Sequence, residues 1–189
     1  MIDIKIFSQS MTLYKNQYRI ESARCPNWDY TSNGYYFVTI CTHKRQCFFG
    51  NVVSAKMQLS DIGLIITKEW QKTSQIRPSV QLDRWVVMPN HLHGIIIINN
   101  PVETFRRNVS TNNNQNISQL KPNSLGSIIG QFKSICTKQI RKIGFTDFRW
   151  QTRFHDHIIR DEESLQRIRQ YIVNNPAKWE LDRNNPKNN

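Results

Sequence analysis

Two histidines two positions apart, His91 and His93, are the residues whose types and spacing most directly suggest chemistry. They open an apolar run after a Pro-Asn pair, so the sequence predicts a hairpin whose strands lie near 82–88 and 91–98. Side chains at positions i and i+2 of a strand share a face, about 7 Å apart. Two neutral imidazoles placed so can converge on one divalent cation. The alternative is a pair of surface or hydrogen-bonded histidines at a strand end.

Tyr171 and Asn175 lie on the helix expected over 161–175. At about 100° per residue, Tyr171 falls at the edge of the apolar stripe of that helix, and Asn175 follows one turn later on the same face. We predict a metal held by His91, His93 and Asn175, with Tyr171 as a nucleophile beside it. A tyrosine, with a free pKa near 10, needs such help to attack phosphorus. The alternatives are a packing tyrosine and an asparagine that only caps the helix.

The charge of the chain favours a polyanionic partner, because 189 residues carry a formal net charge of +12. Between Glu103 and Asp147 the sequence has seven basic residues and no acidic one, which indicates a phosphate-binding surface more than a solvated helix face. Arginines and aromatics near 150–160 would suit stacking on unpaired bases. His157 is either structural or a DNA contact. The predicted DNA-binding residues are Lys133, Lys138, Arg141, Lys142, Trp150, Arg153, His157 and Arg160.

The remaining elements give the fold class. β-branched and aromatic residues predict a strand at 35–42, and Ser60, Ser124 and Asp161 are expected to cap three helices. With a further short strand at 154–159, the order is strand, helix, strand, strand, helix, strand, helix. This order is typical of an α+β fold: a ferredoxin-like antiparallel sheet with helices on one face, plus a C-terminal helix.

The chain is expected to form one domain over residues 34–182. Residues 1–33 are interpreted as an N-terminal arm, residues near 99–123 as a flexible insertion, and residues 183–189 as a disordered tail. No apolar run approaches the roughly 18 residues that a membrane span needs, and the N-terminus lacks a signal-peptide pattern. The sequence therefore predicts no membrane association and a cytoplasmic protein.

Several linked motifs resemble those of one family. They are Met88–Gly94, Trp150-Gln151, His157–Arg160 and Tyr171–Pro176, together with the strand at 36–42. The chain resembles the REP-associated tyrosine transposases, which belong to the single-tyrosine HUH endonucleases and transposases. The resemblance implies the HUH endonuclease fold and a metal-dependent enzyme that acts on single-stranded DNA folded into hairpins. It makes His91 and His93 the metal-binding pair, Tyr171 the catalytic tyrosine and Asn175 the third ligand position, which is often glutamine in mobile relatives.

The expected function is thus that of a single-stranded DNA nickase and strand transferase. It would form a 5′-phosphotyrosine intermediate, use Mg²⁺ or Mn²⁺, and act on single-stranded or hairpin DNA such as REP-type sequences. The protein would be a monomer or a homodimer. The alternative is a non-catalytic module, derived from a transposase, that binds hairpin DNA or RNA. A metal-dependent hydrolase of small molecules is disfavoured, because no obvious carboxylate lies beside the histidine pair in the sequence.

Overall fold

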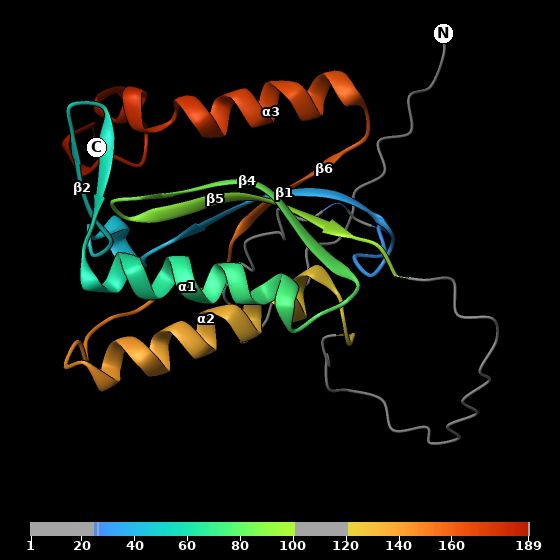
Figure 1. Ribbon diagram of the computed structural model, residues 1–189, viewed down its shortest axis with the longest axis horizontal. Coiled ribbons are helices and arrows are strands. Elements are labelled where there is room, and N and C mark those ends of the chain that lie inside the picture. The colour runs from blue at the N-terminus through green and yellow to red at the C-terminus, as the bar shows by residue number, and fades with distance from the viewer. Residues whose placement is uncertain (1–24, 26, 101–120, 189) are drawn as a thin grey trace, which may run out of the picture.

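The computed structural model describes residues 25, 27–100 and 121–188 (Figure 1). The elements follow the predicted order, with an added hairpin between the first strand and the first helix. Their bounds are β1 Gly34–Cys41, η1 His43–Arg45, β2 Gly50–Val53, β3 Lys56–Leu59, α1 Asp61–Gln75, β4 Val80–Met88, β5 His91–Ile98, α2 Leu125–Lys142, β6 His155–Ile159, α3 Glu162–Asn174, η2 Pro176–Leu181 and η3 Pro186–Asn188.

Within the described chain, β4, β5, β1 and β6 form an antiparallel sheet in that order. The hairpin predicted around Pro89 and Asn90 joins β4 to β5, and β1 lies beside β5 with Cys41 opposite His91. β5 is buried almost throughout because helices cover both faces of the sheet. For that reason its sequence is nearly continuously apolar after the histidines and does not alternate.

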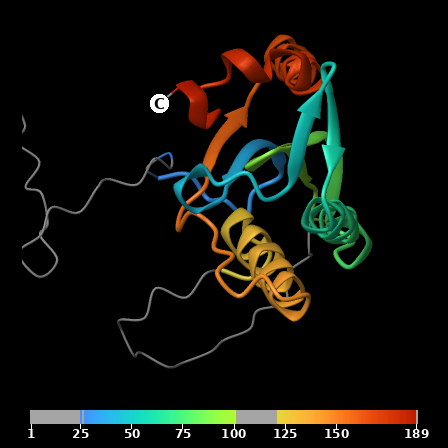
Figure 2. The same cartoon turned by 90° about the vertical axis from the view of Figure 1, so that its left-hand side faces the viewer.

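The helices are divided between the two faces of the sheet. α1 and α2 pack on one face and α3 covers the other, as two perpendicular views show (Figures 1 and 2). This arrangement confirms the ferredoxin-like α+β fold with helices on one face plus a C-terminal helix. Each helix begins where its predicted cap lies, because the side chains of Ser60, Ser124 and Asp161 each accept a hydrogen bond from a backbone N–H of the first turn.

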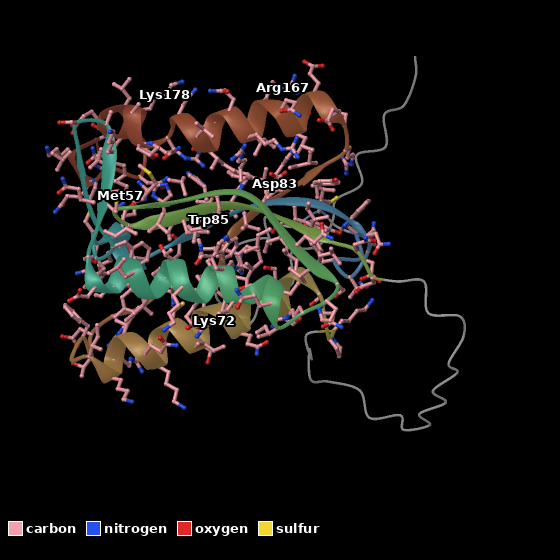
Figure 3. All side chains as sticks on the ribbon, viewed as in Figure 1. Met57, Lys72, Asp83, Trp85, Arg167 and Lys178 are labelled. Atoms are coloured by element: carbon pink, nitrogen blue, oxygen red, sulfur yellow. The ribbon has the colours of Figure 1, made fainter. Side chains whose placement is uncertain are left out.

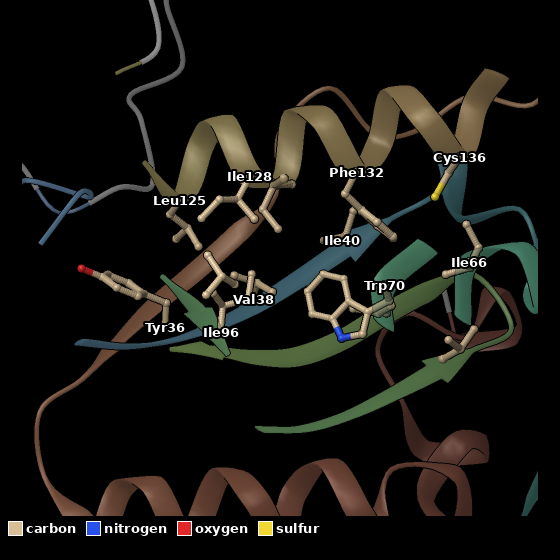
Figure 4. Close-up of a cluster of buried hydrophobic side chains, with 14 of the residues drawn as sticks. Tyr36, Val38, Ile40, Ile66, Trp70, Ile96, Leu125, Ile128, Phe132 and Cys136 are labelled. Carbon is tan, nitrogen blue, oxygen red and sulfur yellow. The ribbon is translucent and has the colours of Figure 1, made fainter. Parts of the chain in front are cut away.

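The main hydrophobic core lies between the sheet and the pair α1 and α2 (Figure 4). Trp70 of α1 is fully buried and packs edge-on against Phe132 of α2. A Cβ atom at Gly94 of β5 would lie 2.6 Å from the Trp70 ring, so this strand position requires a glycine. The core on the α3 side is smaller, with Leu165 and Ile172 of α3 among its buried members. The catalytic candidates lie on this second side.

The ends of the domain differ from the sequence expectation. The sequence predicts a disordered tail over 183–189, whereas residues 183–188 pack on the domain with Asn184 and Asn185 buried. The backbone carbonyl of Asn184 accepts a hydrogen bond from the Asn90 side chain, and the side chain of Asn185 donates one to the Trp179 carbonyl. A purely polar composition does not reveal such contacts. Most of the predicted arm and insertion falls at 1–24 and 101–120, outside the described residues. In the part of the chain that is described, no helix has the length and apolar character to cross a membrane.

Candidate metal and tyrosine site

The histidine pair points toward α3. Strand alternation places His91 and His93 on the face that α3 covers, while Leu92 between them is buried in the core under α1 and α2. The exposed fraction is 0% for His91 and 2% for His93. Their Nε2 atoms lie 3.0 Å apart. The two imidazoles therefore converge, and both are buried instead of lying at the surface.

Asn90 fixes the orientation and tautomer of His91. Its Nδ2 group donates to the backbone carbonyls of Arg45 and Asn184, at 2.8 and 2.7 Å. Its Oδ1 atom therefore faces the Nδ1 atom of His91, at 2.8 Å, and accepts a hydrogen bond from the Nδ1–H group. With the proton on Nδ1, the neutral imidazole presents a lone pair on Nε2, which is the form a metal ligand needs.

His93 has a similar support. Its Nδ1 atom lies 2.9 Å from the Thr39 hydroxyl on β1, so its Nε2 atom is left for the site. Two ligands about 2.1 Å from an octahedral cation and at right angles to each other stand about 3.0 Å apart. The separation of the two Nε2 atoms matches that value. The pair therefore fits the geometry of a small divalent cation.

Burial keeps both imidazoles neutral. It lowers the pKa of His91 to about 3, with the nearby cations Arg45 and Arg183 acting in the same direction. Burial also lowers the pKa of His93 well below its ordinary value, and the adjacent His91 adds to this effect. Both rings can therefore serve as ligands at neutral pH without first losing a proton.

Tyr171 projects from α3 onto the same pair. Its hydroxyl lies 3.1 Å from Nε2 of His93, and its ring packs edge-on against Phe37 of β1. The residue is 45% exposed, so the phenol is open to solvent on one side. Burial of the other side raises the pKa of Tyr171, and a hydrogen bond from Asn175 opposes that rise. At neutral pH the hydroxyl is protonated.

A carboxylate that the sequence reasoning missed completes the cluster. Asp182 lies beyond α3, and its Oδ2 atom is 3.8 Å from Nε2 of His91. The ligand atoms of His91, His93 and Asp182 all lie within 4.8 Å of one another, a grouping that could hold a metal ion. Asp182 sits in a polar segment after the last α-helix, without periodicity or spacing to link it to the histidines. No signal in a single sequence could have found it.

Asn175, the predicted third ligand, lies beside Tyr171. It is 3% exposed, and its Oδ1 atom has no hydrogen-bond partner among the described residues. A buried amide oxygen without a partner is unfavourable and indicates that a partner is missing. Its backbone also forms the C-cap of α3, as the alternative interpretation expected. The site thus offers two imidazoles, one carboxylate and one amide oxygen.

The predicted DNA-binding residues separate into two groups. Lys138, Arg141 and Lys142 are exposed near the C-terminal end of α2. Arg153, His157 and Arg160 are also exposed, and Arg160 lies over the ring of Trp28 at 5.9 Å. These side chains are exposed to solvent.

The second group of predicted DNA-binding residues, Lys133 and Trp150, makes contacts within the protein. The Lys133 ammonium contacts the backbone carbonyls of residues 151–153, and burial lowers its pKa to about 8. Trp150 packs among Phe49, Phe132 and Phe148 and donates its indole N–H to the Lys133 carbonyl. Both side chains therefore shape the 149–153 segment, and we expect neither to stack on bases or to bind phosphate directly.

That segment links the basic helix to the site. The backbone N–H of Gln151 donates to the carbonyl of Cys41, at 2.9 Å, and Cys41 is paired with His91 on β5. The 149–153 segment therefore runs from the α2 side of the sheet to the end of the sheet where the histidines lie. Arg45 and Arg183 add positive charge close to the histidines.

A solved structure of another protein has a similar fold. The fold matches that of a REP-associated tyrosine transposase bound to a REP hairpin, with a TM-score of 0.55 and 19% identity over 85% of this chain and 74% of that chain. At this identity the match establishes the fold, which is the HUH transposase fold that the motifs predict.

The chain belongs to the same family as an uncharacterized protein of Haemophilus influenzae (strain Rd). The two are 38% identical over 165 residues, which is 85% of this chain and 90% of that protein. No family model matches the chain.

Proposed function

We propose that this protein is a metal-dependent single-stranded DNA endonuclease and strand transferase of the REP-associated tyrosine transposase type. One observation carries the proposal: the Tyr171 hydroxyl lies 3.1 Å from His93, within the cluster of His91, His93 and Asp182. A phenol beside a potential metal site, on this fold, is the arrangement that a covalent phosphotyrosine mechanism requires. The structural relative bound to a REP hairpin supports hairpin DNA as the substrate class.

His91, His93 and Asp182 would hold the cation, and Asn175 offers a further oxygen. When bound, Mg²⁺ or Mn²⁺ would polarise a phosphate oxygen and stabilise the negative charge that develops on the phosphoryl group. Asn90 and Thr39 hold the two imidazoles in the ligating orientation. This outer support fixes the orientation of both rings before the cation binds.

The chemical step exchanges one phosphoester bond for another. The Oη atom of Tyr171 attacks phosphorus, the bond from phosphorus to the 3′ oxygen breaks, and a 5′-phosphotyrosine link forms. The phenolic proton ends on the departing 3′-hydroxyl, so the step is balanced in atoms and charge. A second 3′-hydroxyl can reverse the step and join a new strand. Because the bond energy is retained in the covalent link, no nucleotide hydrolysis is required.

The direct test is the covalent adduct. Purified protein is incubated with a labelled hairpin DNA that carries single-stranded flanks, with Mn²⁺ or with a chelator, and resolved on a denaturing gel. We expect a metal-dependent band of protein joined to DNA. Binding of the hairpin without any adduct would favour the non-catalytic module instead. A DNA substrate also favours a cytoplasmic location.

Asp182 tests the composition of the metal site. We expect Asp182→Asn to weaken Mn²⁺ binding by about tenfold or more, because one anionic ligand is lost from a buried cluster. Calorimetric titration of Mn²⁺ into the folded protein measures this effect. Glu180→Gln is the matched control, since Glu180 is an exposed acid of the same segment and its change should leave affinity unaltered. Equal affinity in Asp182→Asn and the parent would remove Asp182 from the site.

The basic face of α2 predicts a strong dependence of DNA affinity on salt. Replacing Lys138, Arg141 and Lys142 together by alanine should flatten the slope of log K against log salt by up to roughly two units, at about 0.7 for each lost single-strand contact. Fluorescence anisotropy at several salt concentrations gives the slope. Lys121→Ala is the control, because Lys121 is already paired with Asp29 at 3.1 Å. An unchanged slope in the triple variant would show that this face does not contact phosphate.

A further inference from the structure

β4 contains an irregularity directly under α3. Leu82 pairs with Ile96 and Trp85 pairs with Gly94, so the two residues between them on β4 oppose one residue of β5. This is the arrangement of a β-bulge, which redirects side chains relative to simple alternation. Leu82 and Trp85 both pack with the core under α1 and α2. Asp83, next to Leu82, points to the opposite face, toward α3, as Figure 3 shows, and the extra residue returns Trp85 to the face of Leu82.

Asp83 binds Arg169 of α3. Its Oδ2 atom accepts a hydrogen bond from Nε of Arg169, at 2.8 Å, and forms an ion pair with Nη2 of the same guanidinium, at 2.6 Å. Its Oδ1 atom accepts from the backbone N–H of Arg84 within the bulge, at 2.7 Å. The backbone of its own strand therefore orients the carboxylate independently of its contact with α3. Its two contacts with one guanidinium give direction as well as attraction.

The ion pair is shielded in comparison with another on the same helix. The side chains of Asp83 and Arg169 are 15% and 30% exposed. The Arg167–Glu163 pair, which lies within α3 on its outer side, is 63% and 82% exposed. Exposed pairs contribute little because water and salt screen them. The pair between α3 and β4 is the better candidate for a contact that holds the helix in place.

The position of Arg169 on the helix matters for Tyr171. At about 100° per residue the two side chains lie about 160° apart, with the apolar stripe of Leu165, Ile168 and Ile172 between them. Arg169 binds Asp83 of β4 on one flank of α3, and Tyr171 contacts His93 and Phe37 on the other flank. Because few apolar side chains anchor α3, rotation about its axis is opposed mainly at these flanks. Such a rotation would move the phenol away from the histidines.

We propose that the Asp83–Arg169 ion pair is a positioning contact that sets the rotation of α3 and holds Tyr171 against the metal site of its own chain. Neither residue is assigned contact with DNA or with the reacting atoms. Its importance for catalysis rests on the proposed function, whereas its effect on the location of Tyr171 does not. The contact that it would maintain is that between Tyr171 and His93 of the same chain.

Kinetics test this role with two substitutions that change the charge in opposite directions. Asp83→Asn and Arg169→Gln should each slow adduct formation at saturating DNA by about tenfold, and the double variant should be no slower than either. The Kd for the hairpin should stay within about twofold of the parent. An electrostatic effect on DNA would instead move the two variants in opposite directions. Arg169→Lys, which keeps the charge but loses the two-nitrogen contact, should fall between them and the parent.

A second measurement does not depend on activity. With 3-fluorotyrosine incorporated at position 171, the fluorine resonance of the parent should be single and shifted by the packed surroundings. Asp83→Asn should broaden it or move it toward the value of an exposed tyrosine. Arg167→Gln is the control for both experiments and should change neither the rate nor the resonance.

The outcomes separate the two proposals. Unchanged rate and resonance in Asp83→Asn, or an equal loss in Arg167→Gln, would overturn the positioning role. A parent protein that forms no adduct, but whose resonance moves in Asp83→Asn, would refute the proposed function and leave the contact established. All variants are compared at 25 °C after circular dichroism has shown each to be folded, so loss of fold is not mistaken for misplacement.

Discussion

Tyr171→Phe should abolish the covalent protein–DNA adduct and leave the fold and DNA binding intact. The change removes one oxygen, whose contacts are with His93 and Asn175. The ring keeps its packing against Phe37 and His93. Since the hydroxyl lies on a half-exposed residue, we expect the free energy of unfolding to change by no more than about 1 kcal/mol. Adduct yield on a denaturing gel and hairpin binding by anisotropy make the comparison.

Tyr35 supplies the matched control. It is 37% exposed on β1, comparable to the 45% of Tyr171, and has no proposed role in the reaction. Tyr35→Phe should form the adduct at the parental rate. An adduct of undiminished yield in Tyr171→Phe would transfer the nucleophile to another residue and refute the central assignment.

The strands and helices could be predicted because their signals are local. The Pro-Asn break before His91, the caps at Ser60, Ser124 and Asp161, and the break at Pro176 each depend on neighbouring residues. The β2–β3 hairpin could not be predicted from such signals, because its strands are four residues each and only half-buried. The resemblance to a family added the order of the motifs. It thereby predicted that Tyr171 lies next to a strand nearly eighty positions earlier in the chain.

The site was only partly predictable for a related reason. The His91–His93 pair and Tyr171 are recognisable by spacing, but Asp182 and the supports Asn90 and Thr39 depend on tertiary contacts. Lys133 and Trp150 show the converse. Their residue types suggested nucleic-acid binding, whereas the fold uses the ammonium to hold three carbonyls and the indole to fill the core. The type of a residue shows which contacts its side chain can make, and the packing of the fold determines which of them it does make.

His91→Ala and His93→Ala should each lower Mn²⁺ affinity by about a hundredfold and cut adduct formation at least as strongly. Each change removes one of two imidazoles whose Nε2 atoms converge at 3.0 Å, and no neighbouring side chain of the described chain can replace it from the same strand face. Calorimetric titration of Mn²⁺ at pH 7.5, with hairpin DNA present to complete the coordination, measures the affinity. At that pH both parental imidazoles are neutral, because burial lowers the pKa of each.

The two variants will also lose some stability, which makes a further control necessary. His91 is fully buried, and its loss leaves the Oδ1 atom of Asn90 without its donor, at roughly 1–3 kcal/mol. Ile96→Ala on the same strand removes a fully buried side chain from the opposite face and should cost about 2–5 kcal/mol. We expect Ile96→Ala to bind Mn²⁺ and form the adduct like the parent at temperatures where it is folded, although it is the less stable protein. If metal affinity instead followed stability across the three variants, the histidines would be packing residues and the metal site would be disproved.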